Sequence, residues 1–294
     1  MKKILIVLSI LLSGFYGISQ EILPYCKIAE MDGEISAIST QVKDALTGNG
    51  FSVIGEYAPA KSKDLFVICF TNNQIKDLCV QYDDRGALAG ILKVGLVKKE
   101  GKTTISILNP EYMFLAYWGK NLNGQESQLT DISNKVKSAL GSFGKPEPFG
   151  GTVEKSDLPD YHYMMMMPYF DDPDELEDFD SFEEGLATIR KNLKAGKGNT
   201  VKVYELVFED KEIAVFGVGL LDTEEGEAHF LPIIGEDNIA NLPYEIILQG
   251  KEATALPGKY RLALFWPSLT MSQFMKISST PGNIKDMLEE LTDD

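Results

Sequence analysis

Histidine is scarce in this sequence, and its scarcity removes one common type of enzyme. Only His162 and His229 occur among 294 residues, and no Gly-x-Ser-x-Gly segment is present. A Ser-His-Asp hydrolase needs a histidine base next to its nucleophile, and α/β-hydrolases hold that nucleophile in the glycine-framed turn. The sequence therefore contains no recognisable nucleophilic hydrolase site.

Cysteine is also rare, with Cys26, Cys69 and Cys79 as the three copies. No Cys-x-x-Cys pair occurs, which argues against a thioredoxin-like redox site. Two interpretations of the thiols remain open. Either Cys69 and Cys79 pair across a strand and the following helix and leave Cys26 over, or all three are unpaired and partly buried. We favour three unpaired thiols.

Basic residues are outnumbered in this chain. Its 28 lysines and arginines face 44 aspartates and glutamates, which gives a formal net charge of -16. A chain with this charge repels nucleic acid and anionic lipid surfaces through its long-range field. Hydrophobic residues make up 44% of the sequence, enough to build substantial cores. We therefore expect a folded acidic protein that has no nucleic-acid partner.

Long apolar runs are missing except at the N-terminus. Lys2 and Lys3 precede the apolar run Ile4–Leu12, and the small-residue triplet Gly17-Ile18-Ser19 follows it. This succession is typical of a secretory signal peptide, and the run is shorter than the about 20 residues that cross a bilayer. We assign residues 1–20 to a signal peptide. We expect an exported protein, periplasmic or extracellular, with no transmembrane segment after signal removal.

What the chain does contain is an internal similarity. Residues 65–70 (LFVICF) and 213–218 (IAVFGV) both read as buried strands, at an offset of 148. Residues 101–110 and 258–267 both begin with Gly-Lys, continue as an alternating strand and reach a proline, at an offset of 157. Each proline is expected to open a helix, because the first helical turn tolerates a missing backbone N–H. The pattern predicts one unit written twice.

The period of the apolar residues predicts a helix near the start of each unit. Ile35, Ile38, Val42 and Leu46 fall at helical spacing. A second such run follows Asp180-Ser181, which favours a helix N-terminus. The predicted fold class is α+β: two similar units, each an antiparallel sheet with helices packed on one face. The predicted segments are the signal peptide at 1–20, the first unit at 21–145, a Gly- and Pro-rich linker at 146–155, and the second unit at 156–294.

These units resemble a known family. Each half resembles domain-of-unknown-function family 302, in tandem. The first half does so through residues 45–53, the strand 90–97 and Asn109-Pro110, and the second through residues 241–248 and the strand that leads to Pro267. Trp266 stands where the family's asparagine is expected. The resemblance implies a small α+β fold, and it implies no established activity and no catalytic residue.

The segment Tyr161–Tyr169 is unusually rich in methionine. By the repeat it corresponds to the first strand of the second unit, and we interpret it as a core strand whose methionines fill the interior. One alternative is a metal site, because thioethers and imidazole are soft ligands that suit Cu(I), with His162, Met164 and Met166 as candidates. Another is a set of adaptable methionines that line an apolar ligand pocket.

Aromatic residues gather near the proline-led segments. Core packing is the default interpretation, and the alternative is a groove for an apolar ligand or peptide. The candidate ligand-binding residues are Tyr112, Trp118, Tyr163, Trp266 and Phe274.

The missing catalytic motifs and the duplication together favour a binding function. We expect a non-enzymatic module of the cell envelope that binds a small apolar molecule or peptide, without a cofactor. The alternatives are a structural protein that assembles with other envelope proteins, a Met/His metal-binding protein, and an enzyme whose site is built from scattered carboxylates and tyrosines.

Overall fold

The computed structural model describes residues 20–122 and 124–293. The predicted signal peptide lies outside the described residues, apart from Gln20. The first half contains a run of strands and helices that begins after a short strand, β1 (Glu21–Ile22). Its elements are β2 (Tyr25–Asp32), α1 (Ile35–Gly48), β3 (Ser52–Tyr57), β4 (Leu65–Thr71), α2 (Asn73–Cys79), β5 (Leu92–Lys99), β6 (Lys102–Leu108), α3 (Pro110–Trp118) and α4 (Glu126–Ala139).

The second half repeats this succession of elements. Its elements are β9 (Asp174–Asp178), α5 (Phe182–Ala195), β10 (Thr200–Phe208), β11 (Ile213–Leu220), α6 (Glu227–Ile234), β12 (Tyr244–Gln249), β13 (Glu252–Ala255), α7 (Gly258–Phe265), α8 (Met271–Phe274) and α9 (Thr280–Glu289). Short 3₁₀ turns, η2 (Gly86–Gly90) in the first half and η7 (Glu236–Asn241) in the second, precede β5 and β12.

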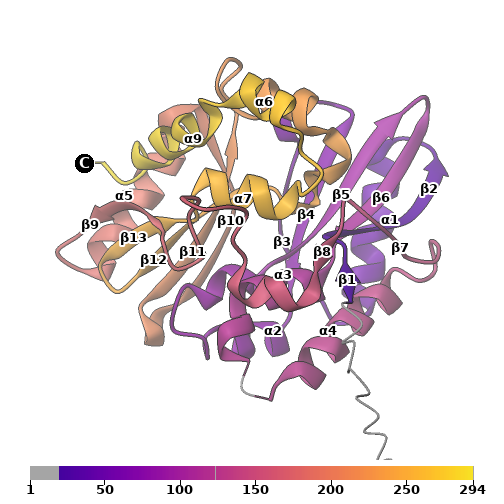
Figure 1. The fold of residues 1–294 in the computed structure, drawn as a ribbon, viewed down its shortest axis with the longest axis horizontal. Coiled ribbons are helices and arrows are strands. Elements are labelled where there is room, and N and C mark those ends of the chain that lie inside the picture. The colour runs from indigo at the N-terminus through magenta and orange to yellow at the C-terminus, as the bar shows by residue number, and fades with distance from the viewer. Residues whose placement is uncertain (1–19, 123, 294) are drawn as a thin grey trace, which may run out of the picture.

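Each half forms one main antiparallel sheet, and these two sheets share a strand order. The first sheet runs β3-β4-β5-β6-β2-β7, where β7 (Glu147–Phe149) is an added edge strand, and the second runs β10-β11-β12-β13-β9. The strands of the second sheet lie on the left in Figure 1 and those of the first on the right. The predicted α+β class with antiparallel sheets is confirmed.

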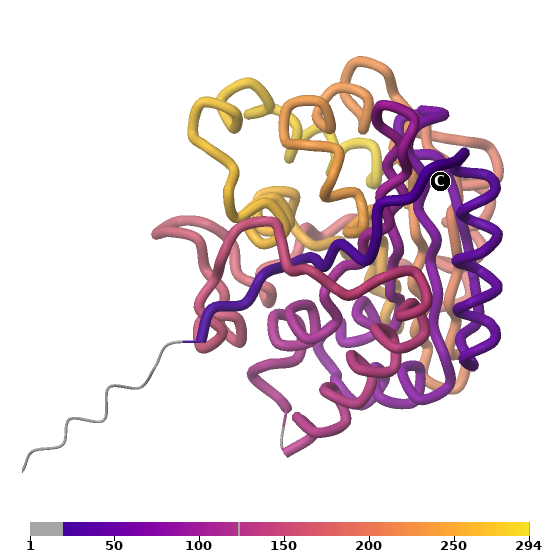
Figure 2. The backbone as a smooth tube through the Cα atoms, turned by 90° about the vertical axis from the view of Figure 1, so that its right-hand side faces the viewer, coloured from indigo at the N-terminus to yellow at the C-terminus, as the bar shows by residue number. Residues whose placement is uncertain are grey.

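The helices that open each half form for the predicted reason. Ile35, Ile38, Val42 and Leu46 are buried along one face of α1, which packs on β3, β4 and β5. In α5 the Ser181 side chain accepts a hydrogen bond from the backbone N–H of Glu184, as an N-cap does. Figure 2 shows α1 in indigo alongside the sheet, on the side away from the C-terminal helices.

One predicted strand is a helix, and this changes the alignment of the halves. Residues 258–265 form α7, whereas the matched residues 102–108 form β6. The counterpart of the hairpin turn at Gly101 is the two-residue turn Gly250-Lys251 between β12 and β13. Helix α7 therefore corresponds to α3, at an offset of 258 - 110 = 148 that equals the offset of the buried strands. Pro267 opens no helix, and the short α8 begins instead after the Thr270 cap.

The predicted strand at Tyr161–Tyr169 is also wrong. This segment is an irregular loop, and the first strand of the second half is β9. Met165 and Met166 are 85% and 96% exposed, so they fill no core. Proline at position 168 and a left-handed φ of 72° at Met166 interrupt any ladder.

The predicted linker, residues 146–155, is built into the first half. It contains β7, which pairs with β2, and β8 (Val153–Glu154), which pairs with β1. The chain leaves the first sheet through these short strands and reaches the loop at 161–171. The predicted linker therefore leads from the first sheet to the loop at 161–171, which contacts the second half through the hydrogen bond from Tyr161 to Ala263.

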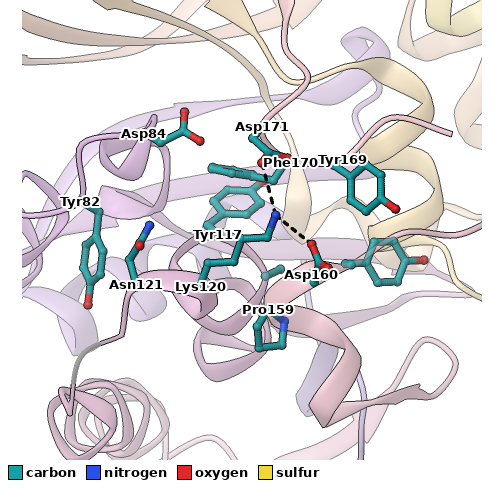
Figure 3. A pocket seen from close by; sticks show the side chains of 12 residues that line it. Tyr82, Asp84, Tyr117, Lys120, Asn121, Pro159, Asp160, Tyr169, Phe170 and Asp171 are labelled. Atoms are coloured by element: carbon teal, nitrogen blue, oxygen red, sulfur yellow. Dashed lines mark hydrogen bonds and ion pairs between the residues drawn. The ribbon is translucent and has the colours of Figure 1, made fainter.

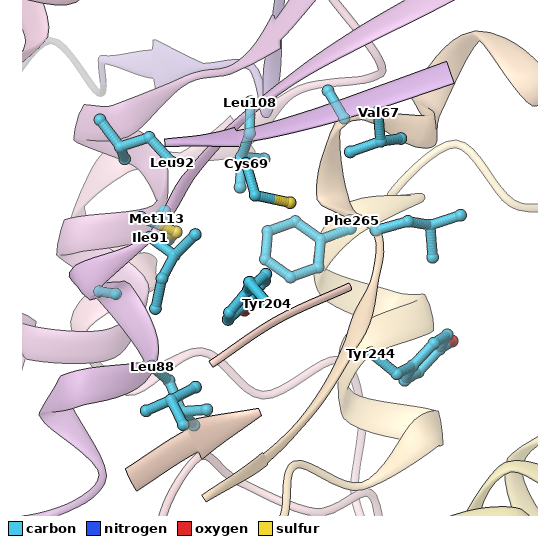
Figure 4. Close-up of a cluster of buried hydrophobic side chains, with 14 of the residues drawn as sticks. Val67, Cys69, Leu88, Ile91, Leu92, Leu108, Met113, Tyr204, Tyr244 and Phe265 are labelled. Atoms are coloured by element: carbon cyan, nitrogen blue, oxygen red, sulfur yellow. The ribbon is translucent and has the colours of Figure 1, made fainter. Parts of the chain in front are cut away.

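The two halves share one core. Turn η7 of the second half packs on β4, β5 and β6, and turn η2 of the first half packs on β11 and β12. Figure 4 shows Cys69 from the first half facing Tyr204 and Phe265 from the second. The sheet face opposite α1 is therefore covered by the other half.

The edge strands β3 and β10 approach each other so closely that a glycine is required. A Cβ atom on Gly55 would lie 2.1 Å from the carbonyl oxygen of Val203. We expect Gly55→Ala to lower the free energy of unfolding by about 1–3 kcal/mol, because the strands must separate to admit the methyl group. Urea unfolding measures the change. Gly48→Ala, where a Cβ would meet no atom within 4 Å, is the control, and an equal effect of both changes would contradict the close approach.

Candidate functional site

An apolar groove lies between the methionine loop and the C-terminal helices. It holds about 510 Å³ of space that opens to solvent. We call it the methionine groove, and its lining residues are Tyr163, Met164, Met167, Lys259, Leu262, Ala263, Trp266, Leu269, Met271 and Phe274.

Helix α7 supplies the floor of this groove. Lys259, Leu262 and Ala263 lie at helical spacing, so they share one face of the helix, and Trp266 follows as its C-cap residue. The loop wall is fixed to that face, because the Tyr161 hydroxyl donates a hydrogen bond of 2.8 Å to the carbonyl of Ala263. The groove is therefore built on regular backbone along its floor.

Helix α8 forms the opposite wall. Thr270 and Gln273 make a reciprocal capping box at its start. The Gln273 amide also donates a hydrogen bond of 3.0 Å to the carbonyl of Ile233 at the end of α6. These contacts hold Met271 and Phe274 in place beside the groove.

Exposed apolar side chains concentrate around this groove. Within the described ranges, the large hydrophobic side chains that are exposed all come from residues 163–166 or 271–275. They are Tyr163, Met164, Met165, Met166, Met271 and Met275. A cluster of this kind marks a binding surface more often than scattered exposed residues do, and methionine adapts its shape to varied partners.

Three of the five predicted ligand-binding residues meet in this groove: Tyr163, Trp266 and Phe274. The other two do not. The Tyr112 hydroxyl donates a hydrogen bond of 2.6 Å to the carbonyl of Leu264, and the Trp118 indole donates one of 2.9 Å to that of Gly86. Both side chains are fully buried, so they pack the core.

The predicted metal candidates are dispersed in their surroundings. His162 stacks on Tyr169 at 4.2 Å between ring centroids, Met164 lines the groove, and Met166 extends into solvent. In the part of the chain that the structure describes, no three His, Cys, Asp or Glu side chains are grouped to hold a metal ion. A thioether site for Cu(I) stays a prediction.

A second, polar pocket lies where the linker meets α3. Lys120 occupies its middle and forms ion pairs of 2.8 Å with Asp160 and 3.3 Å with Asp171, as Figure 3 shows. The hydrogen bond that the Lys120 ammonium donates to Asp160 contributes most to the raised pKa of Lys120. The ammonium and the two carboxylates neutralise one another. We therefore interpret these ion pairs as structural contacts that hold the loop at 160–171 against the first half.

A buried ionic cluster joins the halves, and sequence reasoning missed it. Glu245 on β12 forms ion pairs with Lys93 on β5 and Arg261 on α7, and it also accepts a 3.1 Å hydrogen bond from the Tyr204 hydroxyl. Burial alone would raise the pKa of Glu245, but the two cations outweigh burial and hold that pKa below its ordinary value. None of the four residues lines the methionine groove or the Lys120 pocket. We interpret the cluster as structural.

Glu227, at the start of α6, is a second buried carboxyl group. It accepts hydrogen bonds from the Tyr57 hydroxyl, at 2.8 Å, and from the backbone N–H groups of Ala60 and Leu220. Burial raises the pKa of Glu227 to about 7, although these three donors oppose the shift. The residue therefore titrates near neutral pH at a contact between the halves.

All three cysteines are unpaired, as favoured, and Cys69 and Cys79 form no disulfide; the thiols are buried and not partly buried as expected. Burial raises the pKa of each thiol, that of Cys79 to about 12. We expect the native protein to resist a thiol reagent such as DTNB at pH 8, because thiolate is the reactive form. The same protein in denaturant is expected to release three equivalents, and rapid reaction of the native form would contradict this burial.

Comparison with known proteins gives little guidance. No family model matches the chain, and no curated protein matches it. Among solved structures it is similar to an uncharacterized conserved protein, DUF302, from Bacillus stearothermophilus, at 12% identity and a TM-score of 0.34. That match covers 40% of this chain and 97% of the other. The tandem arrangement of two such units stays a prediction.

The described helices can also be compared with a bilayer. Across residues 20–122 and 124–293, none combines the length and the apolar character that a membrane crossing requires.

Proposed function

We propose that this protein is an exported, non-enzymatic binding module that holds a small apolar molecule in the methionine groove. The observation that carries the proposal is the groove itself, with exposed methionines on two walls and Trp266 on its floor. Exposed apolar surface costs free energy in water, and a ligand that covers it recovers part of that cost. Assembly with another envelope protein through the same surface is the alternative.

The experiment uses the mature chain from residue 20 and the fluorescent apolar probe N-phenyl-1-naphthylamine. We expect probe fluorescence to rise on binding. Replacing both Met164 and Met271 by glutamine removes apolar contacts from opposite walls, and we expect the affinity to fall about tenfold or more. Met165→Gln is the matched control, because Met165 is on the same loop but does not line the groove.

The possible results separate the hypotheses. Unchanged probe affinity in the double variant would overturn the groove as the binding site. A mature chain that binds no probe but forms a stable complex with a protein of its own envelope, lost in the double variant, would favour assembly instead.

Export is proposed on the N-terminal pattern of residues 1–20. We expect the mature protein in the envelope or medium to begin near Gln20, which intact-mass measurement of the native protein tests. Retention of the full chain in the cytosolic fraction would overturn export.

We also propose that the halves arose by duplication of one α+β unit. The shared strand order supports this, as does the equal offset of 148 for the buried strands and for α3 and α7. Lys93 and Glu245 each occupy the second position of the corresponding strands β5 and β12. The buried ion pair therefore joins equivalent positions of the two units.

A further inference from the structure

In residues 20–122 and 124–293, the exposed sulfur-bearing side chains are all methionines from the two segments that form walls of the methionine groove. Met164 and Met271 line the groove and are 48% and 59% exposed. Met165, Met166 and Met275 follow them in the chain and are between 64% and 96% exposed. Oxidants reach exposed methionines most readily, so these two segments are the accessible target for oxidation of sulfur.

The three thiols of the chain are protected from the same oxidants. Cys26, Cys69 and Cys79 are buried, and burial raises the pKa of each thiol, so little thiolate forms. Thiolate is the form of cysteine that reacts with oxidants, whereas a methionine thioether has no proton to lose. The reactivity of the methionines therefore depends on access alone.

Burial also separates the methionines of the chain into two classes. Met113 on α3 and Met287 on α9 are 1% and 5% exposed. An oxidant that acts on the folded chain therefore meets the methionines beside the groove first, and the core methionines provide an internal comparison.

We propose that the methionines of the groove are an oxidation site that controls ligand binding, with peroxides as the class of oxidant. In the reaction, a lone pair of the thioether sulfur attacks one oxygen of hydrogen peroxide. The S–O bond forms as the O–O bond breaks, the transferred oxygen gives its proton to the departing hydroxide, and water leaves. Sulfur is oxidised to the sulfoxide by two electrons, and the peroxide is reduced. This inference rests on the proposed function and adds the regulation of that site.

Oxidation makes the lining of the groove polar. A sulfoxide oxygen on Met164, Met167 or Met271 accepts hydrogen bonds from water. An apolar ligand that displaces this water leaves the oxygen without a donor, which costs free energy. The oxidised groove is therefore expected to release an apolar ligand.

The walls of the groove are held by contacts that contain no sulfur. The Tyr161 hydroxyl donates to the carbonyl of Ala263, and the capping box of α8 joins Thr270 to Gln273. Oxidation leaves these hydrogen bonds in place. We therefore expect affinity to fall while the circular dichroism spectrum and the melting temperature of the chain stay close to those before treatment.

The first readout is the position of the added oxygen. The mature chain from residue 20 is treated with hydrogen peroxide in its native state and then digested with trypsin. We expect added oxygen on the peptides 156–190 and 262–276, which carry the groove methionines, and none on the peptide 103–120, which carries Met113. The chain treated in denaturant is expected to gain oxygen on all three peptides.

The second readout is affinity for N-phenyl-1-naphthylamine. We expect the peroxide-treated chain to bind this apolar probe about tenfold or more weakly than the untreated chain. Methionine sulfoxide is reduced enzymatically, by one enzyme for each sulfoxide epimer. Treatment with both methionine sulfoxide reductases is therefore expected to restore binding.

Two sets of leucine replacements assign the effect to the lining. The variant with Met164→Leu, Met167→Leu and Met271→Leu keeps apolar side chains there but has no sulfur to oxidise. We expect its affinity for the probe to be the same before and after peroxide. The matched control replaces three exposed methionines of the same two segments that do not line the groove: Met165→Leu, Met166→Leu and Met275→Leu. This control is expected to lose affinity after peroxide as the native chain does.

The outcomes distinguish this inference from the proposed function. If the untreated chain binds the probe and the oxidised chain binds it equally well, the groove is a binding site and its control by oxidation is wrong. Equal oxidation of the core peptide and the groove peptides in the native chain would also overturn the inference. If the untreated chain binds no probe, the proposed function fails and control of binding fails with it.

A loss of affinity in the leucine variant of the lining as large as in the native chain would place the sensitive group elsewhere. That result would overturn the inference and leave the proposed function standing.

Discussion

Replacing Glu245 with glutamine is expected to lower the free energy of unfolding by about 3–5 kcal/mol. Glu245, Lys93 and Arg261 are all at most 4% exposed. Removing the carboxylate leaves two buried cations without a counter-charge, and neither can reach water without opening the contact between the halves. Equilibrium unfolding in urea, followed by circular dichroism, measures the loss.

An exposed ion pair provides the control for this prediction. Lys251 and Asp178 pair at 3.0 Å with side chains that are more than half exposed. Asp178→Asn is expected to change stability by less than about 1 kcal/mol, because water and salt screen such pairs. A loss in Glu245→Gln as small as in Asp178→Asn would show that the buried cations find other compensation.

A combined replacement separates unpaired charge from lost packing. In the variant with Lys93→Met, Glu245→Leu and Arg261→Met, no charge is left without a partner. We expect this variant to recover most of the stability that Glu245→Gln loses, since apolar groups of similar volume often replace buried ion pairs without loss.

The sequence gives only a weak indication of the buried cluster of Lys93, Glu245 and Arg261. Lys93 is a single charge inside the apolar run Gly90–Val97, and Glu245 is a single charge inside Tyr244–Leu248. A charge in a strand is usually expected on the solvent side, so each residue alone looks ordinary. Only the corrected alignment of the halves shows that they occupy equivalent positions with opposite sign. That alignment depended on recognising α7 as a helix.

The secondary-structure propensities of the residues in α7 indicate a helix, whereas the alternation of apolar residues in this segment indicates a strand. The strand β6 (KTTISIL) has four β-branched residues, whereas α7 (GKYRLALF) has none and is rich in leucine, alanine, lysine and arginine. β-Branched residues favour strands, and those other residues favour helices. The shared Gly-Lys start and the alternating apolar residues nevertheless favour a strand at residues 258–267 when the two segments are compared by pattern alone. By contrast, α1 and α5 were predictable because four apolar positions at helical spacing leave no competing period.

The sequence predicts some of the residues that line the methionine groove, but it does not predict where the groove lies in the fold. Tyr163, Trp266 and Phe274 were identified as aromatic residues near two unusual segments, and they do meet. Tyr112 and Trp118 lie near a proline-led segment as well, but both are inside the core. The sequence could not distinguish them, because a helix that is apolar on all sides gives no indication of which face is covered. The methionines were expected inside because strand pairing was assumed, and the loop instead carries them to the surface.

Glu227 is expected to make stability depend on pH near neutrality. Its pKa is about 7 in the folded chain and has an ordinary value of 4.5, so between these pH values the folded state binds more protons than the unfolded state. The contribution is fully present below about pH 4.5 and is lost as pH rises through 7. We expect Glu227 to lower the free energy of unfolding by about 2–3 kcal/mol between pH 5 and pH 8. Urea unfolding at both pH values measures this change.

Other carboxylates also titrate, so the informative quantity is the difference between the native chain and Glu227→Gln. We expect the variant to lose this part of the pH dependence, and Glu183→Gln, at an exposed carboxylate in the first turn of α5, to keep it. Parallel curves for the native chain and Glu227→Gln would show that the carboxyl group titrates in its ordinary range.

The Tyr57 hydroxyl should act on the pKa of Glu227 in the direction opposite to burial. The Tyr57 hydroxyl stabilises the charged form of Glu227, so it opposes the rise in pKa that burial causes. Tyr57→Phe removes that hydrogen bond and is expected to raise the pKa of Glu227 further, because only the two backbone N–H donors are left to stabilise the carboxylate. The loss of stability then extends to higher pH. A loss that continues to higher pH in Tyr57→Phe, together with a flatter dependence in Glu227→Gln, would assign the pH sensitivity to the contact of Tyr57 with Glu227.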